Sequence, residues 1–578
     1  MSQNYKIFSH LDDVLDSYKE PVSRVDGLVR RPKDIIRTVE FYSNNQYLSG
    51  NTDSLGREKP FYNVGNYRVT VAKTATDLDV KDIKFEPDSL KHSVQAMLYN
   101  KELYKFLKDS NFSLTLNEMG LVRPKYGGVL VKKSMVDGKL KIDVMDWVNV
   151  DFDPADVLGG TLVETFYLSP SELSAKSDTW YDVGDVLAAH NKLNKNKPAK
   201  IEVKEVSGDF PVNFYPDEED NDSNEYRRMC FYIACVGKKK YLLYAEYEKG
   251  DKYKYLPWEA VGKSLGRGVW EDGFESQTWQ NDAMISMKNV MDISGKVIIS
   301  TDSQKVSGNA ITGVDNGHIF QIEAGRSIQS LNLAPSALPQ FERVIELWNN
   351  QFDRVASTYD ANTGEAPTAG TPYSQTALLN QVANSPFEFR REEWGIFLNE
   401  ILNDWVLPYL KKQILKGHTL VSDYTDDELD IIDEAVATYE GNLFVKDSIL
   451  EKGEVPTPDE LEMVRNGVKN GLNKNGKKRE IEIPEGFLDV KGKLTANITG
   501  ELKNKSAILQ SLDSIFKTVV STYNPQTGQY SALQDKTLNQ IFNQIVEMSG
   551  IPLSSAQLRP AQTSPVQPAD LSAVEPVK

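Results

Sequence analysis

The chain has 578 residues, of which 40% are hydrophobic and 26% are charged, and its formal net charge is −17. This length and composition predict a globular protein of two to four packed units and exclude a disordered chain. The acidic balance argues against a protein that grips nucleic acid by neutralising phosphates. No apolar run of about 18 residues could span a bilayer and the first residues lack a secretory signal, so we expect a cytoplasmic chain with no membrane partner.

The two cysteines and five histidines give no sign of a metal site or a disulfide. Cys230 and Cys235 lie five residues apart in an expected strand, so their side chains should point to opposite faces. The histidines are scattered, without the paired spacing that a metal needs. We therefore expect no metal and no cofactor.

Residues 1–265 are expected to mix helices and strands. The first 90 or so residues are expected to be irregular, whereas residues 92–108 have apolar spacing typical of a helix. Asp137-Gly138 lies between alternating apolar residues, which predicts a hairpin with a two-residue turn.

Two later segments of this region have turn and cap signatures. Ser169, Pro170 and Glu172 form the pattern of a capping box, so a short helix should begin there after a strand. A second hairpin is expected to turn near Gly237-Lys238. The six carboxylates just before it, between residues 217 and 225, lack the spacing of a calcium loop and are interpreted as solvated.

The central region predicts two helices separated by a strand-bearing insert. Residues 270–293 have no proline and a helical apolar pattern, and residues 297–300 and 318–322 are β-like. A second helix then has six apolar residues at steps of three and four: Leu338, Phe341, Ile345, Trp348, Phe352 and Val355. Such a stripe packs along another helix, either as the partner of the first helix in a protruding pin or inside an ordinary globular core.

The rest of the chain is expected to be a loop, a long helix and further helices. The polar segment after Val355 predicts a flexible loop. A helix should restart at Thr371-Pro372 and continue to about Ile414, with a kink at Pro386. Helices should follow, and the proline-bearing tail 552–578 should be disordered.

One segment imitates two catalytic motifs. Gly262, Ser264 and Gly266 fit the GxSxG pattern of serine hydrolases, but no apolar parallel strand precedes them. Gly262-Lys263-Ser264 also imitates a phosphate loop, yet Pro257 occupies the position of the required glycine. A hydrolase using Ser264 stays open as a minor alternative; otherwise we expect no enzyme.

Four segments in succession resemble the portal proteins of tailed bacteriophages, most closely those of short-tailed phages. They are NVDFDPAD (149–156), ETFYLSPSEL (164–173), YLPWEAVGKSLGRGVWEDGFESQTWQN (255–281) and TGEAPTAGTPYSQTALLNQ (363–381). The resemblance covers about residues 149–410, and the order of the segments carries it more than any single motif.

The resemblance implies a mostly helical α+β subunit with named parts. These are an N-terminal wing (1–265), a first stem helix (266–293), a clip (294–336), a second stem helix (337–357), a tunnel loop (358–371), a long kinked helix (372–415), a C-terminal helical crown (416–551) and a disordered tail (552–578).

It also implies a structural role in the virion. Portals form twelve-membered rings at one capsid vertex and conduct double-stranded DNA during genome packaging and ejection. They contact the large subunit of the terminase, the major capsid protein and scaffold, and tail or adaptor proteins, and they assemble in the host cytoplasm. Another virion protein, of the tail or baseplate, is the alternative of the same class.

The residues that the resemblance and the composition place at the channel fall into two groups. The tunnel-loop candidates are Asp360, Asn362, Thr363, Glu365, Thr368 and Thr371. Lys288 and Lys296, near the end of the first stem helix, are candidates for phosphate contact, and facing solvent or a neighbour's carboxylates is an equal alternative for both.

Overall fold

The computed structural model describes residues 6–20, 22–25, 28–53, 56–77, 83–89, 92–136, 138–194, 199–216, 225–248, 250–294, 298–301, 328–331, 338–358, 373–415, 426–473, 484, 486–496, 517, 523–524 and 529–530. In these ranges the chain mixes helices and sheets, so the expected α+β class is confirmed. None of the described helices is long and apolar enough to cross a membrane.

The chain divides into two compact units. The first comprises Met1–Val80 and Leu107–Val406, and the second comprises Lys81–Phe106 and Leu407–Lys578. Residues 81–106, which we expected in the N-terminal wing, belong to the second unit because their strand β3 (Ile83–Pro87) pairs with β16 (Gly492–Ala496).

A five-stranded sheet in the order β10-β9-β8-β7-β6 lies in the first unit. Its strands are β6 (Val150–Asp151), β7 (Leu162–Leu168), β8 (Ile201–Pro211), β9 (Tyr226–Val236) and β10 (Lys239–Tyr247). Helix α1 (Lys6–Ser17) packs on one face of the sheet, and α6 (Pro170–Ser174) and α7 (Val183–Asn194) pack on the other. Cys230 and Cys235, both on β9, are free thiols.

The turns and the cap expected in this region are confirmed. Val236 pairs with Lys239 across a two-residue turn in which Gly237 has φ +63°. Strands β4 (Gly128–Val136) and β5 (Lys139–Val144) are joined in the same way, and Gly138 there has φ +74°. Ser169 and Glu172 form the capping box that begins α6.

A second layer of the first unit is built on the three-stranded sheet β11-β4-β5, where β11 is Tyr253–Pro257. Helices α2 (Pro32–Ser43), α3 (Gly65–Ala75) and α5 (Phe112–Tyr126) contribute to the same core, which contains the buried Trp147 and Trp270. The first unit also has two short hairpins, β1 (Val22–Val25) with β2 (Leu28–Arg30) and β12 (Glu259–Val261) with β13 (Ser264–Arg267).

The expectation that the first 90 residues are irregular is wrong, because α1, α2 and α3 lie there. These helices are short, and the apolar side chains on them, such as Ile36 and Val39, are stabilised by contacts with distant segments. Local periodicity over so few turns is a weak signal.

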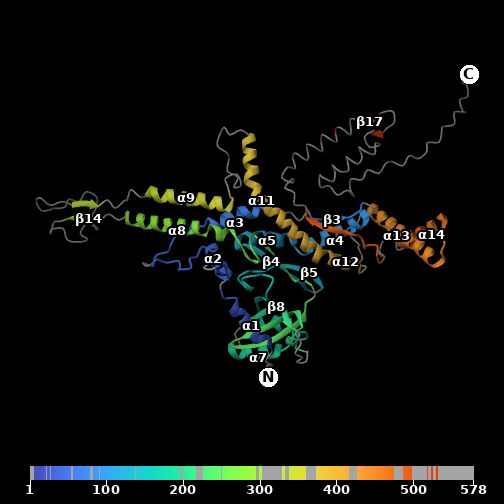
Figure 1. Cartoon of the computed structure of the whole chain (residues 1–578), viewed down its shortest axis with the longest axis horizontal. Coiled ribbons are helices and arrows are strands. Elements are labelled where there is room, and N and C mark those ends of the chain that lie inside the picture. Colours follow the sequence, from blue (N-terminus) through green and yellow to red (C-terminus); the bar gives the residue numbers. More distant parts are fainter. Residues whose placement is uncertain are drawn as a thin grey trace, which may run out of the picture. The chain divides into compact units, whose positions relative to one another are not determined.

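The central helices of the first unit are α8 (Val269–Ser294), α9 (Leu338–Ala356) and α11 (Tyr373–Ile401). Figure 1 shows α8 and α9 side by side, with β14 beyond their ends. Strand β14 (Ile298–Thr301) pairs with β15 (Ile328–Leu331), whereas the expected run 318–322 lies outside the described residues. In Figure 1 α11 changes direction along its length, and Pro386 is the proline inside it.

The described part of the second unit contains the expected helices and two two-stranded sheets, β16-β3 and β17-β18, that we did not expect. Its described elements, besides β3 and β16, are α4 (Ser93–Asp109, whose last residues enter the first unit), α12 (Leu407–Leu415), α13 (Asp426–Lys452), α14 (Pro458–Asn473), β17 (Tyr523–Asn524) and β18 (Gln529–Tyr530). A π-helical turn, Leu402–Val406, which belongs to the first unit, precedes α12 in the chain. The Tyr99 hydroxyl donates to the Leu488 carbonyl at 3.1 Å. The tail 552–578 lies outside the described residues.

Candidate functional site

Helices α8 and α9 form a closely packed antiparallel pair. Gly273 lies opposite Phe352, and a Cβ on Gly273 would come 1.9 Å from the Phe352 ring, so only glycine allows this approach. Farther along, the indoles of Trp279 and Trp348 stack with their centroids 5.7 Å apart and an interplanar angle of 7°. The pairing of 273 with 352 and 279 with 348 means that the two helices run in opposite directions.

The residues expected on the apolar stripe of α9 differ in burial. Phe352 is fully buried and Val355 is 43% exposed, because the buried stripe continues through Ala356, four residues after Phe352. The half-buried members are Phe341, Ile345 and Trp348. The side chain of Leu338 lies outside what the structure describes.

Polar side chains of α8 hold the start of helix α3. The Gln277 Oε1 accepts hydrogen bonds from the backbone amides of Val64 and Gly65, both at 3.0 Å. The Asn281 Oδ1 accepts from the Tyr62 amide at 3.0 Å. Both α8 side chains are fully buried. The first amides of a helix have no partner within it, so Gln277 supplies acceptors that the N-cap residue Val64 cannot, while the Asn63 Oδ1 accepts from the Asn66 amide at 3.0 Å.

Arg68 of α3 is bound to the last turn of α9. Its guanidinium lies 2.6 Å from a carboxylate oxygen of Asp353 and donates to the Asn349 side chain at 3.0 Å. The same carboxylate accepts from the Thr358 hydroxyl at 3.1 Å, and Ser357 between them has φ +56°. The end of α9 is therefore held in one conformation just before segment 359–372.

The other end of α3 is bound to α11. The Arg391 Nε donates to the backbone carbonyl of Ala75 at 2.7 Å, and Arg391 is 9% exposed. A cationic side chain at this end also interacts favourably with the helix dipole. Helix α3 thus joins α8, α9 and α11, and it holds the helices that flank segment 359–372.

The structure describes few of the residues expected at a channel. The tunnel-loop candidates and Lys296 lie outside the described residues: Asp360, Asn362, Thr363, Glu365, Thr368 and Thr371. The ammonium of Lys288 donates to the backbone carbonyl of Glu58 at 2.8 Å. Lys288 therefore contacts its own chain, which neither interpretation of the sequence anticipated.

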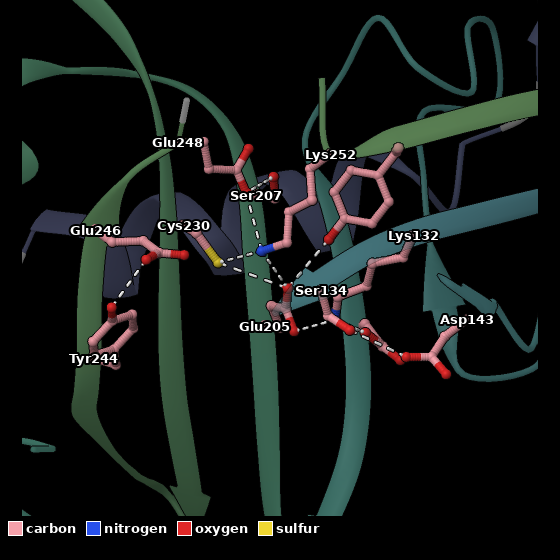
Figure 2. Close-up of polar contacts among 12 residues, drawn as sticks. Lys132, Ser134, Asp143, Glu205, Ser207, Cys230, Tyr244, Glu246, Glu248 and Lys252 are labelled. Carbon is pink, nitrogen blue, oxygen red and sulfur yellow. Dashed lines mark hydrogen bonds and ion pairs between the residues drawn. The ribbon is translucent and has the colours of Figure 1, made fainter. Parts of the chain in front are cut away.

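A buried cluster of charged side chains lies between the two sheets of the first unit, as Figure 2 shows. Lys132 of β4 contacts Glu205 of β8 and, at 2.7 Å, Glu164 of β7. Lys252 lies 2.8 Å from Glu205 and 3.2 Å from Glu248. The cluster therefore links the five-stranded sheet to the three-stranded one through paired charges.

The electrostatics of this cluster favour the charged forms of Glu205, Lys132 and Lys252 and the neutral thiol of Cys230, whereas burial raises the pKa of Glu164 above its ordinary value. Burial alone would raise the pKa of Glu205, but Lys132 and Lys252 lower it below the ordinary value. Burial likewise opposes the charge on Lys132, whose pKa is nevertheless raised by Glu205 and Glu164. Burial and the nearby Glu205 raise the pKa of the Cys230 thiol well above its ordinary value, although Lys252 Nζ is 3.3 Å from its Sγ. The Cys230 thiol is therefore unreactive, and the paired charges around it indicate that the cluster is a structural link between the two sheets.

Close contacts between backbones explain the two glycines of the segment Gly266-Arg267-Gly268. A Cβ on Gly266 would lie 2.3 Å from the Gly127 carbonyl oxygen, and one on Gly268 would lie 2.6 Å from the Gly127 amide. Two backbones thus cross in contact just before α8. The Arg30 guanidinium secures the crossing by donating to the Gly266 carbonyl at 2.9 Å and pairing with Glu271 at 2.7 Å.

Ser264 does not have the geometry of a hydrolase nucleophile elbow. It lies within β13, is 4% exposed, and its hydroxyl is 3.5 Å from the Arg30 Nη1. An elbow would place the serine on a strained turn from a strand to a helix. In the described part of the chain, moreover, no group of three His, Cys, Asp or Glu side chains could hold a metal ion.

No protein-family model matches the chain, and no curated protein is significantly similar to it.

The residues that organise this region were not singled out from the sequence. Gln277 and Asn281 are polar residues one turn apart within a helix that also buries Trp270, and this spacing was the available signal. Arg68 and Arg391 gave no local signal, because their partners lie hundreds of residues away along the chain.

Proposed function

We propose that the chain is a portal subunit of a tailed bacteriophage, which forms a ring of twelve at one vertex of the capsid. The observation that carries this proposal is the succession of elements from α8 to α11. Helix α8, the β14–β15 pair and helix α9 come in the order of stem, clip and stem, and segment 359–372 and α11 follow in the order of tunnel loop and long helix.

The bonds around α3 support this proposal physically. A loop that borders moving DNA needs fixed ends, because the force that the DNA exerts on the loop would otherwise move the helices on either side of it. Arg68 holds the helix before segment 359–372 and Arg391 holds the helix after it, both through α3. Charge-assisted hydrogen bonds of this kind are stronger than neutral ones.

The charge of the chain supports a conduit that does not bind its cargo. Twelve copies with a net charge of −17 would carry about −200 formal charges in total. Double-stranded DNA would then pass without sequence-specific contact.

The partners of the proposed ring follow from this function. They are the terminase large subunit during packaging, the major capsid protein and scaffold around the ring, and tail or adaptor proteins afterwards. The subunit would assemble in the host cytoplasm and remain in the virion as a structural protein without a cofactor.

The other hypotheses explain less of the chain. A tail or baseplate protein would leave the helix, strand pair and helix succession unexplained. A serine hydrolase would need Ser264 to be activated, and this serine is buried in β13 beside Arg30. Ser264→Ala separates the classes, because it would abolish an esterase and leave ring assembly unchanged.

The first experiment is negative-stain electron microscopy of the purified chain, with mass photometry on the same sample. Rings with a central hole and a mass of about 780 kDa, twelve times 65.0 kDa, would support the proposal. If the chain alone stays monomeric, the measurement is repeated with scaffold and capsid proteins present. A monomer that hydrolyses esters, or a chain absent from the capsid vertex, would overturn it.

A further inference from the structure

Helix α8 has an exposed stripe with acidic side chains around an indole. Glu275, Trp279 and Asp282 follow one another at steps of four and three residues, which places them along one side of the helix. Trp279 is 53% exposed, and both carboxylates are exposed. We call these three residues the acidic stripe.

Helix α9 has an exposed stripe of the opposite sign. Arg343, Leu347 and Arg354 follow at steps of four and seven residues, so they too share one side of their helix. Leu347 is 61% exposed, and both guanidinium groups are exposed. We call these three residues the basic stripe.

Glu275 and Asp282 lie two and nine residues from Gly273, and Arg354 and Arg343 lie two and nine residues from Phe352. At 3.6 residues per turn, all four charged residues are therefore on the sides of their helices away from the Gly273–Phe352 contact. Trp348 of α9 stacks on Trp279 of the acidic stripe, and Leu347 of the basic stripe is the residue just before Trp348. Val344 and Val355 are partly exposed beside them, at 36% and 43%. The helix pair therefore presents acidic side chains on the outer side of α8 and basic side chains on the outer side of α9.

The charged residues of the two stripes differ from the other charged residues around α8 and α9. Arg30 with Glu271 and Arg68 with Asp353 are paired within the chain. In the part of the chain that the structure describes, none of the four charged residues of the two stripes belongs to an ion pair. They are therefore available to a partner.

We propose that the acidic stripe of one copy of the chain docks on the basic stripe of a second copy. The stripes are unlike surfaces with opposite charge, and each carries one large apolar side chain that the contact would bury. Contact between unlike surfaces is heterologous, so it continues from copy to copy and produces a ring when the rotation closes. The inference deepens the proposed function by naming its self-contact, and it rests on that function only for the closed ring.

A charge-exchange experiment tests the contact. The variant Glu275→Lys/Asp282→Lys carries only basic stripes, and Arg343→Glu/Arg354→Glu carries only acidic ones. Each variant alone should repel its own copies and lose the oligomer in mass photometry. An equimolar mixture should recover it, because a basic stripe on α8 of one variant meets an acidic stripe on α9 of the other.

Two control variants keep the interpretation specific. Lys238→Glu/Lys239→Glu makes the same change in net charge as the acidic variant, at an exposed turn of the five-stranded sheet, and should assemble like the wild type. Leu193→Glu removes a 60% exposed apolar residue on α7 and should also assemble. Unchanged circular dichroism and thermal midpoints would establish that all variants fold.

The outcomes separate this contact from the proposed function. Rings that persist in both charge-reversed variants would overturn the contact and leave the portal proposal standing. Open or small oligomers that vanish in each variant and return in the mixture would support the contact and count against the ring. If the wild type is monomeric, and the folded variants are also monomeric in the mixture, the proposed contact is overturned.

Discussion

Gly273 and Phe352 touch between helices α8 and α9, where a Cβ on the glycine would lie 1.9 Å from the phenyl ring. Gly273→Ala should therefore lower the free energy of unfolding by about 1–3 kcal/mol, because the methyl group displaces a fully buried ring. Helix propensity alone would favour alanine by about 1 kcal/mol. Urea denaturation measures the difference.

The matched control is Gly184→Ala in α7, since a Cβ there would meet nothing within 4 Å. This control should be as stable as the wild type or slightly more stable. If Gly273→Ala behaves in the same way, the two helices are not in the contact described here.

Gln277 should be needed for the stability of the first unit. Gln277→Leu leaves the amides of Val64 and Gly65 buried without their acceptor, so we expect a loss of about 1–3 kcal/mol. Hydrogen exchange of these two amides should also accelerate. Ser286→Ala, an exposed change on the same helix, should alter neither quantity, and unchanged exchange in Gln277→Leu would contradict the capping role.

The buried charges between the sheets should be strongly interdependent. Lys132→Met leaves Glu205 and Glu164 without one of their cations in a buried site, and we expect a loss of about 3–5 kcal/mol in the free energy of unfolding. Lys141→Met is the control, because its ion pair with Asp143 is largely exposed and should contribute less than about 1 kcal/mol. Equal effects of the two substitutions would show that the cluster is not buried as described.

Asp272 at the start of α8 should make stability depend on pH. Burial raises its pKa to about 6, with Arg267 opposing and Glu259 and Glu271 reinforcing the shift. The folded state thus binds the proton more tightly than the unfolded state, so the contribution of this carboxyl is largest below pH 4 and is lost as pH rises through about 6.

Comparison with Asp272→Asn isolates this effect from the other titrating groups. The wild type should gain stability relative to the variant when urea denaturation is moved from pH 7 to pH 5. A difference between the two proteins that does not change with pH would mean that the pKa of Asp272 is not raised.

Local chemistry allowed several elements to be predicted correctly. The hairpin turns at Gly138 and Gly237 follow from positions that need a positive φ, which few residues other than glycine adopt. The start of α6 follows from Ser169 and Glu172, which satisfy the first amides of their own helix. Each signal lies within a few residues of the feature that it specifies.

Other elements could not be predicted, because their partners are distant in sequence. Strand β3 pairs with β16, about 400 residues later, and this pairing moves residues 81–106 into the second unit. Val355 was expected on the packed stripe of α9 and is instead 43% exposed, since Ala356 continues the buried side. Period alone defines a stripe only to within about one residue.

The sequence by itself determined the α+β class, the two central helices and the turns, because periodicity, caps and glycine conformations act over short distances. Only the tertiary structure decided that Gln277 caps α3, that Arg68 and Arg391 tie α3 to the helices around segment 359–372, and that the acidic and basic stripes lie away from the contact between α8 and α9. These relationships depend on which helices pack together. Packing is set by shape and by the satisfaction of buried polar groups across the whole core, and no local segment encodes it.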